Sequence, residues 1–331
     1  MDRDRLRLVV VALAALSATA MSACHEKAAR RKPQDAGPPV EARVAAIGTV
    51  AKLSPELQRA FDPAVDFEPP LAPGEDDWLA AHPEPGQTYD QFVASDPNKP
   101  DAERRILYLL PLGRIDGDGA PALEPLVAVI HAFYGLEVKM LPAVTLEDVK
   151  PTTRVNDYTE KRQLLAPDVL HWMSWNVPKD AYGVVAITME DLYPDPEWNF
   201  VFGQASLKER VGVQSFARYD PAFFGEARPS GWQALVLRRA SWTMVHEIGH
   251  MFGLQHCVHY RCIMGGSNNQ DESDRAPLHV CPVCAHKLWW ALRYDAAARE
   301  DALATALRAA GFADEAAWSE RRARWIRTGT R

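Results

Sequence analysis

The run HEIGHMFGLQHC at residues 246–257 constrains this chain more than any other feature. In a helix, His246 and His250 lie four residues apart and project from the same face. Gly253 can adopt a positive φ, which ends a helix and turns the chain back, so that His256 can approach the other two histidines. Three neutral imidazoles with one coordination position left open are typical of a catalytic zinc site.

Glu247 lies beside the first of these histidines and can reach the same cavity. A zinc ion lowers the pKa of its bound water and polarises a peptide carbonyl, and Glu247 can take the proton from that water and pass it to the leaving amine. The motif therefore predicts a zinc-dependent metallopeptidase that acts on a peptide or protein substrate. The alternative is a zinc-binding pseudoprotease that serves as a peptide-binding envelope lipoprotein. A lipoprotein whose zinc only stabilises the fold is a third possibility.

Four of the five cysteines follow the third histidine, as two close pairs: Cys257, Cys262, Cys281 and Cys284. Two such pairs suit one tetrahedral zinc ion, and the C-x-x-C spacing of the second pair favours metal. We therefore predict a second, structural zinc. The same thiols could form two disulfides in an oxidising compartment, and the sequence leaves this alternative open.

Met264 stands in a glycine-containing turn two residues after the second cysteine of the cluster. Methionine fills apolar gaps, and at this place it could form the floor beneath the catalytic metal. Three further histidines lie near the cysteines in sequence. We expect His259, His279 and His286 to be surface or loop residues and not metal ligands.

The N-terminus has the composition of an export signal. Three arginines precede an apolar stretch at residues 8–20, and small residues then lead to Cys24. This order resembles a bacterial lipoprotein signal, in which Cys24 becomes the lipidated first residue. We expect a signal peptide at 1–23 and a mature chain anchored by lipid to a membrane of the bacterial cell envelope, on its periplasmic or surface side. A short membrane anchor and an ordinary signal peptide are the alternatives.

Composition divides the rest of the chain into three parts. Residues 24–76 are Pro-rich with little to bury and are expected to form a tether. Residues 77–295 hold the motifs and form the predicted peptidase domain, and residues 296–331 form a C-terminal helical extension. The net charge of −7 and the scattered basic residues argue against nucleic acid as a partner.

Strand-like and helix-like segments alternate within the predicted domain. Strands are expected at 105–110, 136–144, 183–188, 200–203 and 211–216, and helices at 121–134, 158–175 and 235–251. This alternation predicts an α/β fold with a mixed β-sheet and flanking helices.

Together these motifs resemble the archaemetzincins, a branch of the metzincin zinc peptidases. The family joins an HExxHxxGxxH helix directly to a cysteine, then to a Cys-x-Met turn and a C-x-x-C pair, and this chain carries them at 246–257, 262–264 and 281–284. Segments at 78–88 and 191–205 are also similar to the family, so the resemblance spans about residues 77–295.

The resemblance implies a metzincin-like fold in which Met264 is the Met-turn residue, the three histidines hold the catalytic zinc, and the four cysteines hold a second zinc. It also implies that the strand near 200–205 lines the cleft, where it could pair with an extended substrate. Two features depart from the pattern. The lipoprotein-like N-terminus lies outside the family core, and Gly266 stands where some metzincins place a tyrosine as an additional metal ligand.

Overall fold

The computed structural model describes residues 37–206 and 208–330 of the chain. The predicted signal peptide at 1–23 and the predicted lipidation site at Cys24 lie outside this part. Within it, no helix combines the length and the apolar character that crossing a bilayer requires.

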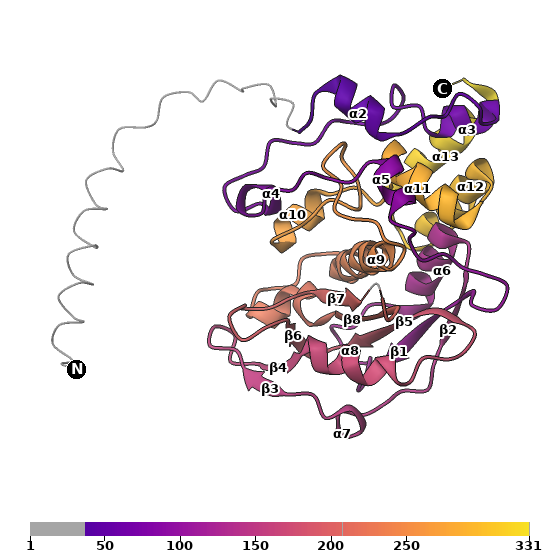
Figure 1. Cartoon of the computed structure of the whole chain (residues 1–331). Helices are drawn as coiled ribbons and strands as arrows, with labels where there is room; N and C mark the ends of the chain where they lie inside the picture. Colours follow the sequence, from indigo (N-terminus) through magenta and orange to yellow (C-terminus); the bar gives the residue numbers. More distant parts are fainter. Residues whose placement is uncertain (1–36, 207, 331) are drawn as a thin grey trace, which may run out of the picture. The chain divides into compact units, whose positions relative to one another are not determined.

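A mixed sheet of five strands lies at the centre of the fold, in the order β2-β1-β5-β8-β7 (Figure 1). Four strands run parallel, and β7 pairs antiparallel with β8 at one edge. The mixed α/β fold expected from the sequence is therefore confirmed. The strands are β1 (Ile106–Pro111), β2 (Glu137–Met140), β5 (Ala181–Thr188), β7 (Gly203–Ser206) and β8 (Val211–Ser215).

Helices cover both faces of this sheet. On the central strand β5, Val184 and Ala186 point into the cluster that α8 (Ala166–Ser174) completes. Val185 and Ile187 point to the opposite face, where α9 (Trp232–Met251) and α6 (Leu123–Tyr134) pack. Because successive side chains of a strand alternate between faces, a strand covered on both sides is buried at every position, as β5 is.

A smaller sheet of three strands, in the order β3-β4-β6, flanks the main one. Its strands are β3 (Thr153–Val155), β4 (Arg162–Leu165) and β6 (Asp191–Tyr193). The short helices of the chain are α4 (Trp78–Ala81), α5 (Tyr89–Ala94), α7 (Leu146–Val149) and α10 (Gln270–Arg275), with 3-10 turns η1 (Ala217–Tyr219) and η2 (Pro221–Phe224).

The prediction of one helix over 158–175 is wrong in its first half. The chain forms β4 there, and α8 begins only at Ala166. Pro167 lies in the first turn of α8, where proline is tolerated because the first amide groups of a helix have no partner within it. Glu160 has a φ of 55°, which interrupts any helical course before β4.

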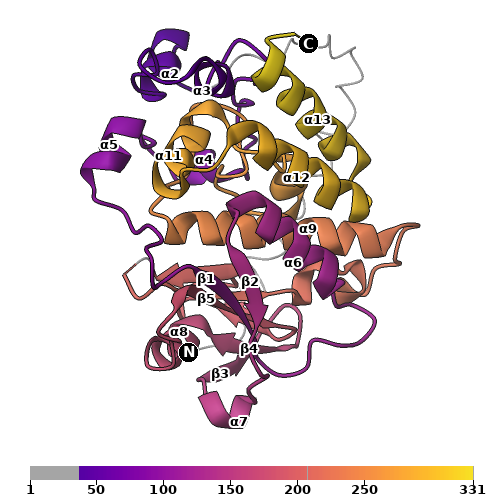
Figure 2. The same ribbon diagram turned by 90° about the vertical axis from the view of Figure 1, so that its right-hand side faces the viewer.

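The C-terminal part is helical, as predicted. It consists of α11 (Pro282–Leu292), α12 (Ala296–Ala309) and α13 (Ala313–Thr328). α12 and α13 pack side by side, α12 also packs on α6, and α13 packs on α3 (Pro55–Ala60) (Figure 2).

The expectation of a tether with little to bury is wrong over residues 37–76. This segment forms α2 (Val40–Ala46) and α3, and it buries Ile47 and Phe61 in the main core. The guanidinium of Arg322 on α13 donates hydrogen bonds to the carbonyl oxygens of Arg59 and Ala60. Phe61 stacks on His286 of α11, with ring centroids 4.5 Å apart. The segment is therefore part of the folded body.

Candidate metal and catalytic site

Helix α9 places the first two histidines of the motif on one face, one turn apart. The Nε2 atoms of His246 and His250 are 3.0 Å apart. One ring nitrogen from each of His246, His250 and His256 lies within 4.8 Å of the others. A tetrahedral zinc ion with bonds of about 2.0–2.1 Å needs ligand nitrogens about 3.3 Å apart, so the three imidazoles fit one zinc ion.

The turn that brings in the third histidine forms as expected. Gly253 has a φ of 83°, and its amide donates to the carbonyl of His250. A side chain here would be strained by this φ, and its Cβ would lie 2.7 Å from Cβ of Pro97. Glycine at this position is therefore required both by the backbone and by its neighbour.

The hydrogen bonds of the rings set their protonation. Nδ1 of His246 lies 2.8 Å from the carbonyl oxygen of Ile263, and Nδ1 of His250 lies 2.7 Å from that of Leu254. A carbonyl oxygen only accepts, so each Nδ1 carries the proton and each Nε2 keeps a lone pair for a metal ion. Burial, reinforced by the neighbouring histidines, lowers the pKa of His246 well below its usual value and that of His250 to about 4, so both are neutral at pH 7.

Glu247 of α9 lies against the edge strand β7. A Cβ added to Gly203 of β7 would lie 3.1 Å from Cγ of Glu247. Enclosure by the surrounding protein raises the pKa of Glu247 to about 7, and a nearby dication would favour its charged form. No group in residues 37–206 or 208–330 makes a hydrogen bond to this carboxylate, so it is available to a water molecule.

Met264 lies directly beneath the helix. A Cβ added to Gly249 would lie 2.4 Å from Sδ of Met264, which is itself buried. Met264 therefore packs against the turn of α9 that carries His250, and its role as the floor beneath the metal stays a prediction.

The four cysteines form a second cluster. Their sulfur atoms lie within 4.8 Å of one another, and all four side chains are buried and unbridged. The backbone amides of Met264 and Cys281 both donate to Sγ of Cys262, as amides commonly do to thiolates in zinc sites. The arrangement fits a tetrahedral zinc ion and favours the metal alternative over two disulfides.

Residues 139–289 match the family model described as Peptidase family M54. The chain is 38% identical to archaemetzincin-2 of Homo sapiens over 276 residues, which covers 75% of this chain and 76% of that protein. The chain belongs to the archaemetzincin family. The predicted enzyme class, a zinc metallopeptidase, and the predicted zinc dependence are thereby confirmed.

More distant relatives and solved structures are also similar to this archaemetzincin. It is 32% identical to archaemetzincin-1 of Homo sapiens over 239 residues, which covers 64% of this chain and 48% of that protein. The structure of archaemetzincin from Archaeoglobus fulgidus complexed with malonate is 28% identical, with a TM-score of 0.42, and the match covers 55% of this chain and 99% of that chain. Archaemetzincin from Methanopyrus kandleri is 29% identical, with a TM-score of 0.44, a 59% share of this chain and 99% of that chain.

A buried ion pair fixes the loop that leads into β7. Arg218 donates two hydrogen bonds of 2.7 Å to the carboxylate of Asp191. The side-chain amide of Gln163 donates to the same carboxylate and to the carbonyl oxygen of Asn199. Asp191 and Asn199 thus fix the first and second halves of the family-like segment at 191–205. This places β7, which begins at the end of that segment, beside Glu247.

The expectation that three nearby histidines are surface or loop residues holds for His259 and His279, which lie in loops, and is wrong for His286, which lies in helix α11. His286 is buried and stacks on Tyr89 with ring centroids 3.6 Å apart. His279 stacks on Trp318 with centroids 3.9 Å apart, and burial lowers its pKa to about 3. His259 is also buried. Each is covered by the C-terminal helices or the N-terminal segment, and none belongs to the histidine cluster that fits a metal.

Two residues of the site were missed by sequence reasoning. Glu84 accepts a hydrogen bond from His256 Nδ1, and Trp78 lies against the same imidazole with ring centroids 5.0 Å apart. Neither residue has a local signal, because both lie more than 170 positions before His256 in the chain.

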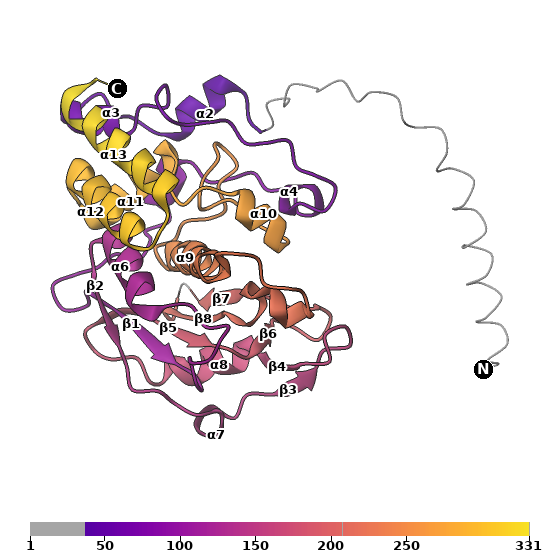
Figure 3. The same cartoon turned by 180° about the vertical axis from the view of Figure 1, so that it is seen from behind.

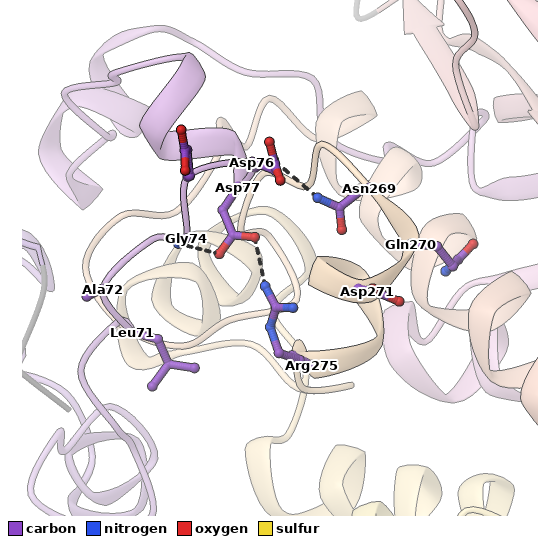
Figure 4. Close-up of a pocket in the computed structure, with 10 residues that line it drawn as sticks. Leu71, Ala72, Gly74, Asp76, Asp77, Asn269, Gln270, Asp271 and Arg275 are labelled. Atoms are coloured by element: carbon purple, nitrogen blue, oxygen red, sulfur yellow. Dashed lines mark hydrogen bonds and ion pairs between the residues drawn. The ribbon is translucent and has the colours of Figure 1, made fainter. Parts of the chain in front are cut away.

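The polar loop at 267–275 reaches this corner of the site. Its helix α10 lies beside α4 (Figure 3), and the carboxylate of Glu272 accepts hydrogen bonds of 2.9 and 3.1 Å from the backbone amide of Trp78. A pocket opens between α10 and the segment that precedes α4, where Asp77 pairs with Arg275 at 2.7 Å (Figure 4). The loop therefore contacts the metal site through Trp78.

Proposed function

We propose that this archaemetzincin hydrolyses peptide bonds with Glu247 as the general base. The convergence of three Nε2 lone pairs beside this carboxylate carries the proposal. A zinc ion bound by His246, His250 and His256 would polarise the scissile carbonyl and acidify a water molecule. Glu247 would hold that water, accept its proton on the carboxylate, and deliver the proton to the leaving amine.

The substrate proposed is an extended peptide that pairs with β7. Among the described strands, only β8 pairs with β7, so its other edge is open. The amide of Ser215 donates a hydrogen bond to the carbonyl of Phe202. In an antiparallel pair, the backbone polar groups of every second residue point to the partner strand. Those of Gly203 and Ala205 therefore point away from β8, to the open edge. An added strand would pass close to Glu247.

The test compares Glu247→Gln with wild type on a peptide library read by mass spectrometry, with and without a chelator. We expect the variant to retain zinc while hydrolysis falls at least about 100-fold. Glu103→Gln, at an exposed glutamate, is the matched control and should cleave like wild type. Turnover retained in Glu247→Gln would reject the general base. Binding of peptides by wild type without any cleavage would support the pseudoprotease instead.

We also propose that Cys24 anchors the mature protein to a membrane of the bacterial cell envelope. The support is the sequence of residues 1–24 alone. Cells that express the full chain and are fed labelled palmitate should label wild type but not Cys24→Ala. Equal labelling of both proteins, or of neither, would reject the lipid anchor.

A further inference from the structure

The three histidines differ in the hydrogen-bond partner of Nδ1, the ring nitrogen that does not face the metal. His246 and His250 donate to backbone carbonyls, whereas Nδ1 of His256 lies 2.9 and 3.1 Å from the two carboxylate oxygens of Glu84. We propose that Glu84, held by Trp78, is a positioning residue that fixes His256 as the third zinc ligand. The inference rests on the proposed zinc site.

His256 needs such a partner more than the other two histidines do. His246 and His250 lie on α9, where the helix fixes the backbone and packing restricts the rings. His256 lies beyond the Gly253 turn, outside any helix or strand. Its ring therefore depends on its own contacts, and the hydrogen bond to Glu84 is the one that restricts its rotation.

Trp78 holds the carboxylate in place. Its indole Nε1 donates to Oε1 of Glu84 at 2.9 Å, and the same oxygen accepts from His256. The indole edge also packs on the His256 ring, with an angle of 76° between the ring planes. Glu84 thus joins two rings that touch each other, and the three side chains restrict one another.

The space that Trp78 fills is open because residue 266 is glycine. A Cβ added to Gly266 would lie 2.3 Å from Cδ1 of the indole. The position at which some metzincins carry a ligand tyrosine therefore contributes here in another way. It lets Trp78 approach the third histidine.

The segment that carries Glu84 is attached to the turn that carries His256. The side-chain amide of Gln87 donates to the carbonyl oxygen of Gly253 at 3.2 Å, and its oxygen accepts from the amide of Gln255 at 3.3 Å. Lys287 of α11 donates to the same oxygen at 3.0 Å. Segment and turn are therefore held together at two residues that precede the histidine.

Charge adds to the effect of geometry. A carboxylate on Nδ1 makes the imidazole a stronger donor at Nε2 and offsets the charge of a bound dication, which a neutral carbonyl does not do. Glu84 lies outside residues 139–289, the part that matches the family model. Among residues 37–206 and 208–330, Glu84 is the one charged group that makes a hydrogen bond to a ligand ring.

The experiment measures zinc affinity in the full chain by competition with a fluorescent chelator. We expect Glu84→Gln, which keeps a hydrogen-bond acceptor but loses the charge, to weaken binding at the histidine site about 10-fold, and Glu84→Ala up to about 100-fold. Trp78→Phe, which keeps the ring and removes the N–H, should fall between wild type and Glu84→Ala. The exposed control Glu103→Gln should bind like wild type.

Cobalt substitution separates this effect from general loosening of the fold. The absorption bands of cobalt on histidines should shift in Glu84→Gln, while the thiolate-to-cobalt bands of the cysteine cluster stay unchanged as an internal reference. Zinc affinities and cobalt spectra equal to wild type in both Glu84 variants would overturn the inference. If Glu84→Ala fails to fold, the zinc affinities of Glu84→Gln and Trp78→Phe test the same inference. These measurements need no turnover. The inference on Glu84 can therefore fail while the proposed function of Glu247 stands, and the proposed function of Glu247 can fail while the inference on Glu84 stands.

Discussion

From the contact between Gly249 and Met264 we predict that the effect of Gly249→Ala on the free energy of unfolding changes sign with the residue at position 264. Replacing glycine with alanine inside a helix normally stabilises it by about 0.5–1 kcal/mol. In this chain the new Cβ would lie 2.4 Å from Sδ of Met264 and 3.0 Å from its Cε. Forcing a methyl group into a packed core costs about 1–3 kcal/mol. Gly249→Ala should therefore destabilise the wild-type protein by about 1 kcal/mol.

Removing the methionine should reverse this sign. Met264→Ala alone should cost about 2–5 kcal/mol, because it leaves a cavity beneath α9. In that background the methyl group of Gly249→Ala enters free space, and only the gain in helix propensity remains. The second substitution should then stabilise by about 0.5–1 kcal/mol, which gives a coupling energy of about 1–3 kcal/mol between the two positions.

The assay is urea denaturation of wild type, both single variants and the double variant, with zinc in excess throughout. The free energies of unfolding form a double-mutant cycle. An equal effect of Gly249→Ala in both backgrounds would contradict the placement of Met264 under the helix.

Three further outcomes follow from named contacts. Ala205→Pro removes an amide from the open edge of β7 and should lower kcat/KM about 3- to 10-fold with unchanged zinc content, whereas unchanged cleavage would argue against strand pairing. Cys281→Ser should lower the zinc content from two ions per chain to one and destabilise the protein by about 4 kcal/mol or more, and two disulfides in wild type would replace this account. The hydrogen bonds from Arg228 lower the pKa of Asp220, so this pair stabilises the fold above the ordinary aspartate pKa of about 3.9 and the stabilisation is lost as the pH falls through the lowered value. Asp220→Asn should therefore cost about 1–2 kcal/mol at pH 7 in thermal unfolding, and this cost should shrink as the pH falls through the lowered pKa of Asp220, whereas a cost that does not change with pH would contradict the ion pair.

The catalytic constellation was predictable because its members are close in sequence. His246 and His250 lie on one helix face because they are four residues apart, and Gly253 indicates the turn that leads to His256. The buried strands β1, β5 and β8 were predictable because their signal is also local, whereas the strand expected at 200–203 forms only at 203–206 and the one expected at 136–144 only at 137–140. A strand such as β5, buried on both faces, reads as a continuous apolar run.

The contacts that the sequence does not reveal join distant segments. Glu84 meets His256 across 172 positions, and no local pattern in residues 78–88 indicates that pairing. The same holds for residues 37–76, where Ile47 and Phe61 are buried by residues far away in the sequence. Their partners lie in the C-terminal helices, so composition alone suggested a tether. The first half of the 158–175 segment was misassigned because the apolar residues of β4 continue the helical spacing of α8.

The central claim is that three imidazoles hold one zinc ion beside Glu247. A crystal structure of the zinc-loaded protein, with anomalous diffraction recorded at the zinc edge, tests it most directly. We predict one peak about 2.0–2.1 Å from Nε2 of His246, His250 and His256, and a second about 2.3 Å from the four cysteine sulfurs. A protein with full zinc content and no peak within bonding distance of all three histidines would contradict the account.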